Sequence, residues 1–226
     1  DNGQPFLDAF VFQQNGPDGV TPERNYYVNY ANARIAVIDS NQDEATLQSK
    51  IVPWLERVMS AGDATWKFAV MHHPAYSSGS IGSNSYMQWP FQAWGASAVI
   101  AGHDHDYERI IKNGFPYFVD GLGGESIVGW GSTVSGSQVR YNGDYGAMLI
   151  DSSSTSLNFQ FVNRSGQVID SYALGATSIS KPSAPSGVLA SVEASTEAKI
   201  TWTDTSPTLT SSFEIARSND GGSTYS

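Results

Sequence analysis

AVIAGHDHDYER, at residues 98–109, combines a short apolar run, a glycine and two histidines one residue apart. Residues 66–73, WKFAVMHH, follow the same plan, because their apolar run leads directly into two adjacent histidines. Each apolar run predicts a short buried strand. All four histidines of the chain therefore follow predicted strands, and they are His72, His73, His103 and His105.

The pattern around these two stretches predicts alternating strands and helices. Strands are expected at residues 25–30, 33–39, 66–71 and 98–101, a long helix at 43–61 and a short helix at 86–94. Pro53 lies inside the long helical pattern, so that helix is expected to kink or to begin near Ile51. This order predicts βαβ units and a mainly parallel sheet, whose ligand sites lie at the carboxyl ends of the strands.

After Arg109 the pattern changes to short β segments without helices. They are expected around Ile110 and at residues 117–119, 137–141, 147–151, 156–161 and 168–172. These segments predict an antiparallel sheet packed on the α/β part. Residues 178–186, rich in Ser and Pro, predict a linker. Beyond it, a separate small β domain is expected, with strands at 187–194, 199–203 and 213–218.

Composition limits the classes of partner. The 226-residue chain carries a net charge of −10 and no basic cluster, so nucleic acid is a poor partner. Its apolar runs are too short to span a membrane. Cysteine is absent, so disulfides and thiolate metal sites are excluded. The chain starts at Asp1 without an initiator Met, and we expect it to be part of something longer; the missing signal peptide therefore carries no weight.

A metal centre is the first hypothesis for the histidines, because neutral imidazole is the commonest metal ligand in proteins. His103 and His105 are two residues apart and can flank one site, while Asp104 and Asp106 would then point elsewhere. Pro74 favours extended backbone at the preceding histidine, and only one of the adjacent pair is expected to face the site. The alternative is a polar turn whose histidines meet water.

Two segments carry a family resemblance. VMHHP at residues 70–74 and AGHDHDYER at 101–109 resemble the last two metal-ligand motifs of the calcineurin-like metallophosphoesterases. The nearest subfamily is the purple acid phosphatases, which carry Met-His-x-Pro and then Gly-His-x-His-x-Tyr-Glu-Arg. Residues 26–40 and 117–124 also resemble the flanking strands of that family. The resemblance implies an α/β fold, an α+β sandwich of metallophosphoesterase type, of which residues 1–177 form the C-terminal part.

The resemblance also implies roles for the histidines. His72 and His103 would bind one metal of a dinuclear pair, and His105 would bind the other. His73 falls where relatives vary, so it would be at most a substrate-facing or outer catalytic group. The cofactors implied are two divalent or trivalent ions: iron, zinc or manganese. The reaction implied is hydrolysis of a small phosphate ester, as in acid phosphatases, by a hydroxide held between two metals.

One part of the family pattern is absent. The family's first three motifs supply a metal-binding Asp, a bridging Asp and an Asn-His pair, and nothing in residues 1–71 resembles them. We therefore expect a fragment that holds only part of the ligand set and is not an active phosphatase alone. Tyr107, Glu108 and Arg109 match the family motif, and we expect them to hold the loop.

The last forty residues resemble the start of a fibronectin type III module. PSGVL at residues 185–189, ITWTD at 200–204 and FEIAR at 213–217 carry this resemblance. It implies that residues 187–226 are a truncated, partial all-β immunoglobulin-like sandwich. Such a module would act as a spacer or as an adhesion unit for a cell surface or polysaccharide. A secreted or cell-surface location follows as an expectation.

Other classes of function remain open at this stage. A phosphodiesterase or nucleotidase of the same superfamily fits the same motifs. A surface adhesin with a degenerate phosphatase-like half, or a metal-binding β protein such as a cupin-like barrel, are non-catalytic alternatives. The cupin pattern has three or four residues between its second His and its Glu, whereas only two residues separate His105 from Glu108. The predicted βαβ order also disfavours a barrel.

Overall fold

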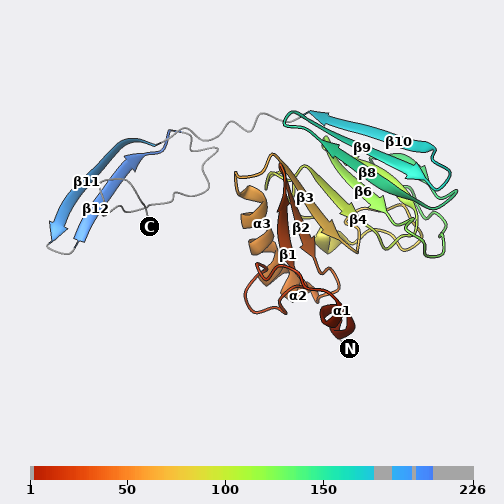
Figure 1. Ribbon diagram of the computed structural model, residues 1–226, viewed down its shortest axis with the longest axis horizontal. Coiled ribbons are helices and arrows are strands. Elements are labelled where there is room, and N and C mark those ends of the chain that lie inside the picture. The colour runs from red at the N-terminus through yellow and green to blue at the C-terminus, as the bar shows by residue number, and fades with distance from the viewer. Residues whose placement is uncertain (1–2, 176–184, 195–196, 206–226) are drawn as a thin grey trace. The chain divides into compact units, whose positions relative to one another are not determined.

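The computed structural model describes residues 3–175, 185–194 and 197–205. Contacts between Cα atoms divide the chain into two units, residues 1–177 and 178–226 (Figure 1). The first unit contains a seven-stranded sheet in the order β1-β2-β3-β4-β6-β5-β7. Its strands are β1 (Tyr26–Tyr30), β2 (Ala33–Ile38), β3 (Trp66–Met71), β4 (Ala98–Ala101), β5 (Tyr107–Lys112), β6 (Phe115–Asp120) and β7 (Ser137–Tyr141).

The centre of this sheet is parallel. β2, β3, β4 and β6 run in the same direction, while β1, β5 and β7 pair antiparallel with their neighbours. In the register, Ile38 of β2 lies opposite Met71 of β3, which in turn lies opposite Ala101 of β4. Three neighbouring strands therefore end at the same level, and the residues that follow them meet at one edge of the sheet.

The long predicted helix is present, with a local change at its proline. It comprises α2 (Glu44–Thr46), the π-helical turn η1 (Leu47–Ile51) and α3 (Val52–Ser60). The carboxylate of Asp43 accepts a hydrogen bond from the backbone N–H of Thr46 and caps the start. Proline has no N–H to donate and its ring crowds the carbonyl four residues earlier. The wider π turn before Pro53 accommodates this, so the helix neither stops nor begins at Ile51.

The short helix predicted at residues 86–94 is wrong. The structure has a single 3-10 turn, η2 (Ser85–Met87), followed by irregular turns. Pro90 disfavours helical backbone at Trp89, which explains the end of the helix. The apolar side chains that suggested a helix are buried in a loop instead, and they include Met87, Phe91 and Trp94. A short helix that was not expected, α1 (Gln4–Ala9), lies near the N-terminus.

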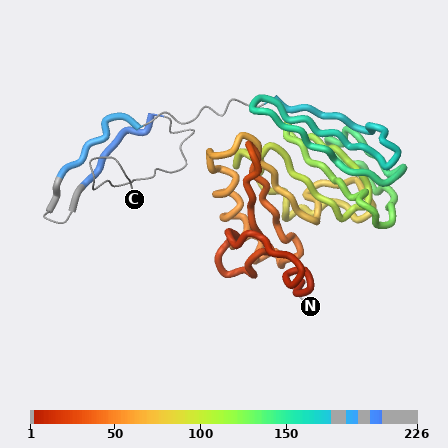
Figure 2. Tube along the Cα trace, viewed as in Figure 1, coloured from red at the N-terminus to blue at the C-terminus, as the bar shows by residue number. Residues whose placement is uncertain are grey.

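The β segments predicted around Ile110 and at residues 117–119 and 137–141 were expected in an antiparallel sheet, but they are β5, β6 and β7 of the main sheet, where β6 pairs parallel with β4. The last three predicted segments form a separate antiparallel sheet, as predicted. Its order is β10-β9-β8, with β8 (Gly146–Ser152), β9 (Ser156–Asn163) and β10 (Val168–Gly175). Phe159 and Phe161 of β9 share one core with Phe68 and Phe118 of the main sheet. In Figure 2 the green-to-cyan strands of this second sheet lie over those of the main sheet. The mixed α/β fold inferred from the sequence is therefore confirmed.

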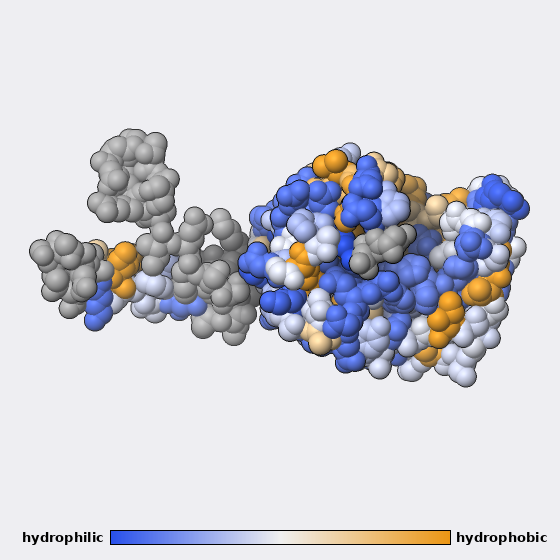
Figure 3. Space-filling view, turned by 90° about the horizontal axis from the view of Figure 1, so that it is seen from below, coloured by the Kyte–Doolittle hydropathy of each residue, from blue (hydrophilic) through white to orange (hydrophobic). Residues whose placement is uncertain are grey.

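The other face of the main sheet packs on the long helix. Trp54, Leu55 and Met59 of α3 belong to a second core, together with Ala69 and Met71 of β3. The first unit is thus layered as helix, mixed sheet and antiparallel sheet. On the face of this unit that Figure 3 shows, hydrophilic residues dominate and apolar ones are scattered among them.

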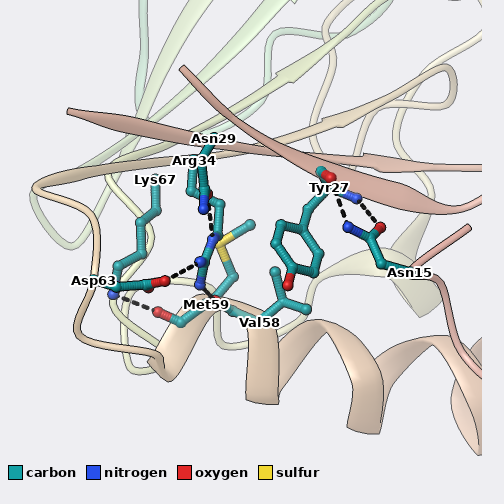
Figure 4. A network of polar contacts seen from close by, with 8 residues as sticks. All are labelled: Asn15, Tyr27, Asn29, Arg34, Val58, Met59, Asp63 and Lys67. Atoms are coloured by element: carbon teal, nitrogen blue, oxygen red, sulfur yellow. Dashed lines mark hydrogen bonds and ion pairs between the residues drawn. The ribbon is translucent and has the colours of Figure 1, made fainter. Parts of the chain in front are cut away.

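Two buried cations connect the strands to the end of α3 (Figure 4). Arg34 of β2 donates to the carbonyl of Val58 at 3.0 Å and to the carboxylate of Asp63 at 2.5 Å. Lys67 of β3 donates to the carbonyl of Met59 at 2.6 Å. The last carbonyls of a helix have no partner within the helix and carry partial negative charge. The two cations satisfy this helix end, which explains their presence in strands that are otherwise apolar.

The described part of the second unit is a two-stranded antiparallel sheet of β11 (Ser186–Ala194) and β12 (Glu197–Thr203). These strands match those predicted at 187–194 and 199–203, although β11 begins inside the predicted linker. The strand predicted at 213–218 lies outside the described residues, and a fibronectin type III fold stays a prediction. None of the helices in the described ranges has the length and apolar content needed to cross a membrane.

Candidate metal centre

Three histidines meet where β3 and β4 end. His72 and His73 follow β3 directly, and His103 follows β4 after Gly102. The backbone N–H of Gly102 donates to the carbonyl of His72 at 3.0 Å, which extends the pairing of the two strands. Nδ1 of His103 lies 2.9 Å from Nε2 of His72. One ring nitrogen from each of the three histidines lies within 4.8 Å of the others.

Both adjacent histidines contribute to this cluster. The ring centroids of His72 and His73 lie 4.8 Å and 4.4 Å, respectively, from that of His103. The expectation that only one of the pair faces the site is therefore wrong. Irregular backbone after β3 allows it, because strict alternation of side chains applies only inside a strand.

His103 has an unusual backbone conformation. Its φ angle is +69°, in the left-handed region that residues other than glycine rarely adopt. The N–H of Asp104 donates to the carbonyl of Gly102 at 2.9 Å, which closes a tight turn around His103. Strained backbone of this kind is concentrated at functional sites, where the surrounding structure holds it.

His105 lies on the same loop but outside the three-histidine cluster found among the described residues. Its Nδ1 lies 2.7 Å from the carbonyl oxygen of Ser126, which accepts a hydrogen bond and cannot donate one. The proton of a neutral His105 is therefore on Nδ1, and Nε2 remains available as a ligand. Histidines that bind metals commonly donate their other N–H to a backbone carbonyl in this way.

Asp104, which lies between His103 and His105, and Asp106, which follows them, point into the protein, as the alternation predicts. Asp104 is fully buried and accepts hydrogen bonds from the hydroxyl of Ser77 at 2.5 Å and the N–H groups of Ile81 and Gly82 at 2.8 and 3.0 Å. A Cβ at Gly79 would lie 2.2 Å from the carboxyl carbon of Asp104, so the loop must have glycine there. The Ser- and Gly-rich loop is thus bonded to the histidine loop.

Two further buried carboxylates follow on the same side. Glu108 accepts from the N–H and the hydroxyl of Ser78, both at 2.6 Å, and from the hydroxyl of Ser137 at 2.5 Å. Both oxygens of Asp106 have no hydrogen-bond partner among the described residues. Burial, followed by the charges of Asp104 and Glu108, raises the pKa of Asp106 to about 7.

The Tyr-Glu-Arg segment has the structural role expected for it. The hydroxyl of Tyr107 donates to Asp170 of β10 at 2.8 Å, and Arg109 donates to the same carboxylate at 2.7 and 3.1 Å. Tyr107 also stacks on Phe161 with ring centroids 4.2 Å apart. These contacts fasten the strand after the histidine loop to the second sheet.

One residue of the site escaped the sequence analysis. Ser40 follows β2 and is 2% exposed, and its Oγ lies 2.9 Å from Nδ1 of His73. The signal that would have found it is the strand register. Ser40, His73 and His103 each lie two residues beyond three paired positions.

The cluster fits a transition-metal ion through its donor chemistry. Imidazole nitrogen suits zinc, iron, nickel and copper, and it binds metals only in its neutral form. Burial, with His103 as the next cause, lowers the pKa of both His72 and His73, so neutral imidazole is favoured. A cavity of about 390 Å³ opens beside His72. Its lining is mainly apolar, with Arg24 and Asp39 as charged members.

Comparison with known proteins agrees with this geometry. Residues 5–107 match the family model for calcineurin-like phosphoesterases. The chain matches no curated protein sequence.

Solved structures show the same fold. A purple acid phosphatase, PPD1 from yellow lupin (Lupinus luteus), matches 76% of this chain and 35% of its own with a TM-score of 0.65 and 19% identity. GAP50, described as the anchor in the inner membrane complex of Plasmodium, matches 67% of this chain and 54% of its own with a TM-score of 0.58 and 24% identity. PhoD matches 76% of this chain and 46% of its own with a TM-score of 0.51 and 11% identity. The chain thus spans about a third to a half of these proteins.

Proposed function

We propose that this chain supplies the histidine side of the active site of a metal-dependent phosphoric ester hydrolase. The observation that carries the proposal is the approach of His72 Nε2 and His103 Nδ1 to 2.9 Å at the ends of two adjacent parallel strands. The match of residues 5–107 to the calcineurin-like phosphoesterase family model supports the reaction class. We further propose that the substrate is a small phosphate monoester, as in acid phosphatases.

Two metal ions are part of this proposal. His72 and His103 would hold one ion through the nitrogens that face each other, and His105 would hold the second through Nε2. Bound ions of this kind act as Lewis acids toward phosphate oxygens and lower the pKa of water. Iron, zinc and manganese are the candidate metals.

The protein's own groups would do three things. The buried carboxylates of Asp104 and Glu108 fix the positions of both loops, so the histidines are held before a metal arrives. The carbonyl of Ser126 keeps the proton of His105 on Nδ1. The cavity beside His72 offers an apolar wall for the organic part of a small ester, with Arg24 at its margin. In a chain with a net charge of −10, a bound cation would make the local charge favourable for an anionic substrate.

The direct test is metal binding by the chain, measured by titration calorimetry with Zn²⁺ and by metal analysis after dialysis. We expect His72→Ala to weaken zinc binding at least about tenfold, since it removes one of the two facing ligands. Glu56→Gln is the matched control, because Glu56 is exposed on α3, away from the site. A chain that takes up no metal would exclude the hydrolase and favour the non-catalytic adhesin instead.

Turnover tests the substrate class. Residues 1–71 contain no counterpart of the family's Asp and Asn-His motifs, so we propose that the chain alone binds metal without fast hydrolysis. In a longer form that supplies those carboxylates, p-nitrophenyl phosphate should be hydrolysed faster than bis(p-nitrophenyl) phosphate. The reverse preference would support a phosphodiesterase or nucleotidase. A fibronectin-like second unit and a secreted or cell-surface location remain parts of the proposal.

A further inference from the structure

Ser40 is placed beside His73 by the register of two parallel strands. Ile38, the last residue of β2, pairs with Met71, the last residue of β3, and the two residues of interest each lie two positions further on. Ser40 is buried, and its neighbour Asp39 is held by the side chain of Asn25 and by an ion pair with Arg24. The serine is therefore fixed on a rigid strand end.

Two hydrogen bonds join Ser40 to His73. The backbone N–H of His73 donates to Ser40 Oγ at 3.0 Å, so the hydroxyl oxygen is an acceptor in that bond. The same oxygen lies 2.9 Å from Nδ1 of the His73 ring. Within residues 3–175 the hydroxyl makes these two hydrogen bonds, and the ring nitrogen is the group among them that can accept its proton.

The direction of the bond between Ser40 Oγ and His73 Nδ1 follows because the buried hydroxyl proton needs an acceptor. Leaving a buried hydroxyl proton without an acceptor is unfavourable, because the group has lost its bond to water. Ser40 therefore donates to Nδ1 of His73, which must be unprotonated. A neutral imidazole with a bare Nδ1 carries its proton on Nε2.

We propose that Ser40 is a positioning residue that holds His73 as an Nε2–H hydrogen-bond donor at the metal centre, directed to a phosphate oxygen of the substrate and not to a metal. This assignment rests on the proposed function. It divides the three-histidine cluster by role: His72 and His103 are ligands, while His73 supplies a donor whose ring lies 4.4 Å from that of His103. Phosphate oxygens need such donors, and a donor fixed in advance loses little freedom on binding.

The test uses nitrogen NMR of the whole chain with ¹⁵N-labelled histidine. The chain has only four histidines, so single substitutions assign every signal. In the metal-free chain we expect His73 to show the Nε2–H tautomer. On addition of Zn²⁺, signals of His72 and His103 should shift to those of coordinated nitrogen, and His73 should keep its Nε2 proton.

Variants of Ser40 test the cause of this tautomer. Ser40→Ala should leave His73 as a mixture of tautomers, whereas Ser40→Thr, which keeps a hydroxyl, should restore the Nε2–H form. Ser49→Ala, an exposed serine on η1, is the control and should change nothing. The ratio of zinc bound per chain should be the same in Ser40→Ala as in the unchanged protein.

Each contrary result has a distinct meaning. If His73 acquires the signature of a coordinated nitrogen, its donor role is wrong while the proposed metal centre stands. If none of the histidines responds to zinc, iron or manganese, the proposed function fails. If His73 carries its proton on Nδ1 in the metal-free chain, the proposed role of Ser40 is wrong. This measurement is made on the unchanged chain, so it does not depend on whether the Ser40 variants fold.

Discussion

Nδ1 of His103 lies 2.9 Å from Nε2 of His72, although the two residues are 31 positions apart in the chain. The contact exists because β3 and β4 are parallel neighbours that end at paired residues, Met71 and Ala101. Without a metal, one of the two nitrogens must carry a proton and donate to the other. A metal bound by both nitrogens would require that proton to move to the other nitrogen of its ring. Because only neutral imidazole is a ligand, metal affinity should rise with pH as any imidazolium is lost.

Because His103 has a left-handed backbone conformation, we predict that its replacement by glycine will stabilise the protein but weaken metal binding. His103→Gly removes the Cβ that makes this conformation costly, so the free energy of unfolding should rise by roughly 0.5–1 kcal/mol. The same change removes a ligand, so stabilisation by zinc should largely disappear. Urea denaturation with and without Zn²⁺ measures both effects.

Asn113→Gly is the control for this prediction. Asn113 also has a positive φ angle, +51°, but lies in the turn between β5 and β6, away from the histidines. It should gain stability by a similar amount and keep the response to zinc. A His103→Gly variant that binds zinc as tightly as the unchanged chain would remove His103 from the ligand set.

The strands could be predicted from sequence because each is a short apolar run bounded by turn residues. Residues 66–71 and 98–101 form strands with the predicted bounds, and the histidines follow them. Local pattern was enough there because burial on both faces of a parallel strand demands apolar residues throughout. The segment around Trp89 failed for the opposite reason. Its apolar residues are buried by packing against distant strands, and this burial needs no helical period.

The part of the site that sequence could not reveal depends on pairing between strands. Ser40 stands in a polar stretch that reads as an ordinary turn, and nothing local marks it as a partner of His73. The relation appears only when Ile38 is known to pair with Met71. In the same way, Asp170 could not be connected to Tyr107 before the second sheet was placed, since they are 63 positions apart in the chain.

Asp104 should be needed for the loop that follows β3, not for metal affinity directly. Asp104→Asn replaces one carboxylate oxygen with an NH₂ group. Each oxygen accepts from one of the two backbone N–H groups, so in either orientation the new NH₂ faces a donor. We expect a loss of about 2–3 kcal/mol in unfolding free energy. The amides of Ile81 and Gly82, which donate to this carboxylate, should exchange with solvent faster. Asp18→Asn, an exposed change, serves as the control, and unaltered exchange at both amides would contradict the assignment.

Asp170 should stabilise the packing of the two sheets against each other. Asp170→Asn leaves the partly buried guanidinium of Arg109 without its ion pair, and removal of one partner from such a pair typically costs on the order of 3 kcal/mol. Tyr107→Phe removes one hydrogen bond and should cost about 1 kcal/mol. The double variant should lose less than the sum, because both changes remove the same contact. Additive losses in thermal or urea unfolding, or a large loss of zinc affinity, would argue against a purely structural role.

Asp120, the last residue of β6, should make the protein less stable as pH rises. Burial raises the pKa of its carboxyl to about 6 from an ordinary value of 3.8, with partial opposition from the backbone of Met148. The folded protein therefore binds more protons than the unfolded chain between pH 4 and 6, and stability falls with pH across that window. Asp120→Asn removes this dependence. At pH 8 the variant should therefore be more stable than the unchanged protein by up to about 3 kcal/mol, whereas below pH 4 the two should be equally stable.

Urea denaturation over pH 3.5–8 measures the effect, with Asp151→Asn, an exposed change on β8, as the control. A gain of equal size at every pH would mean that the substitution acts through packing and that the carboxyl of Asp120 titrates normally.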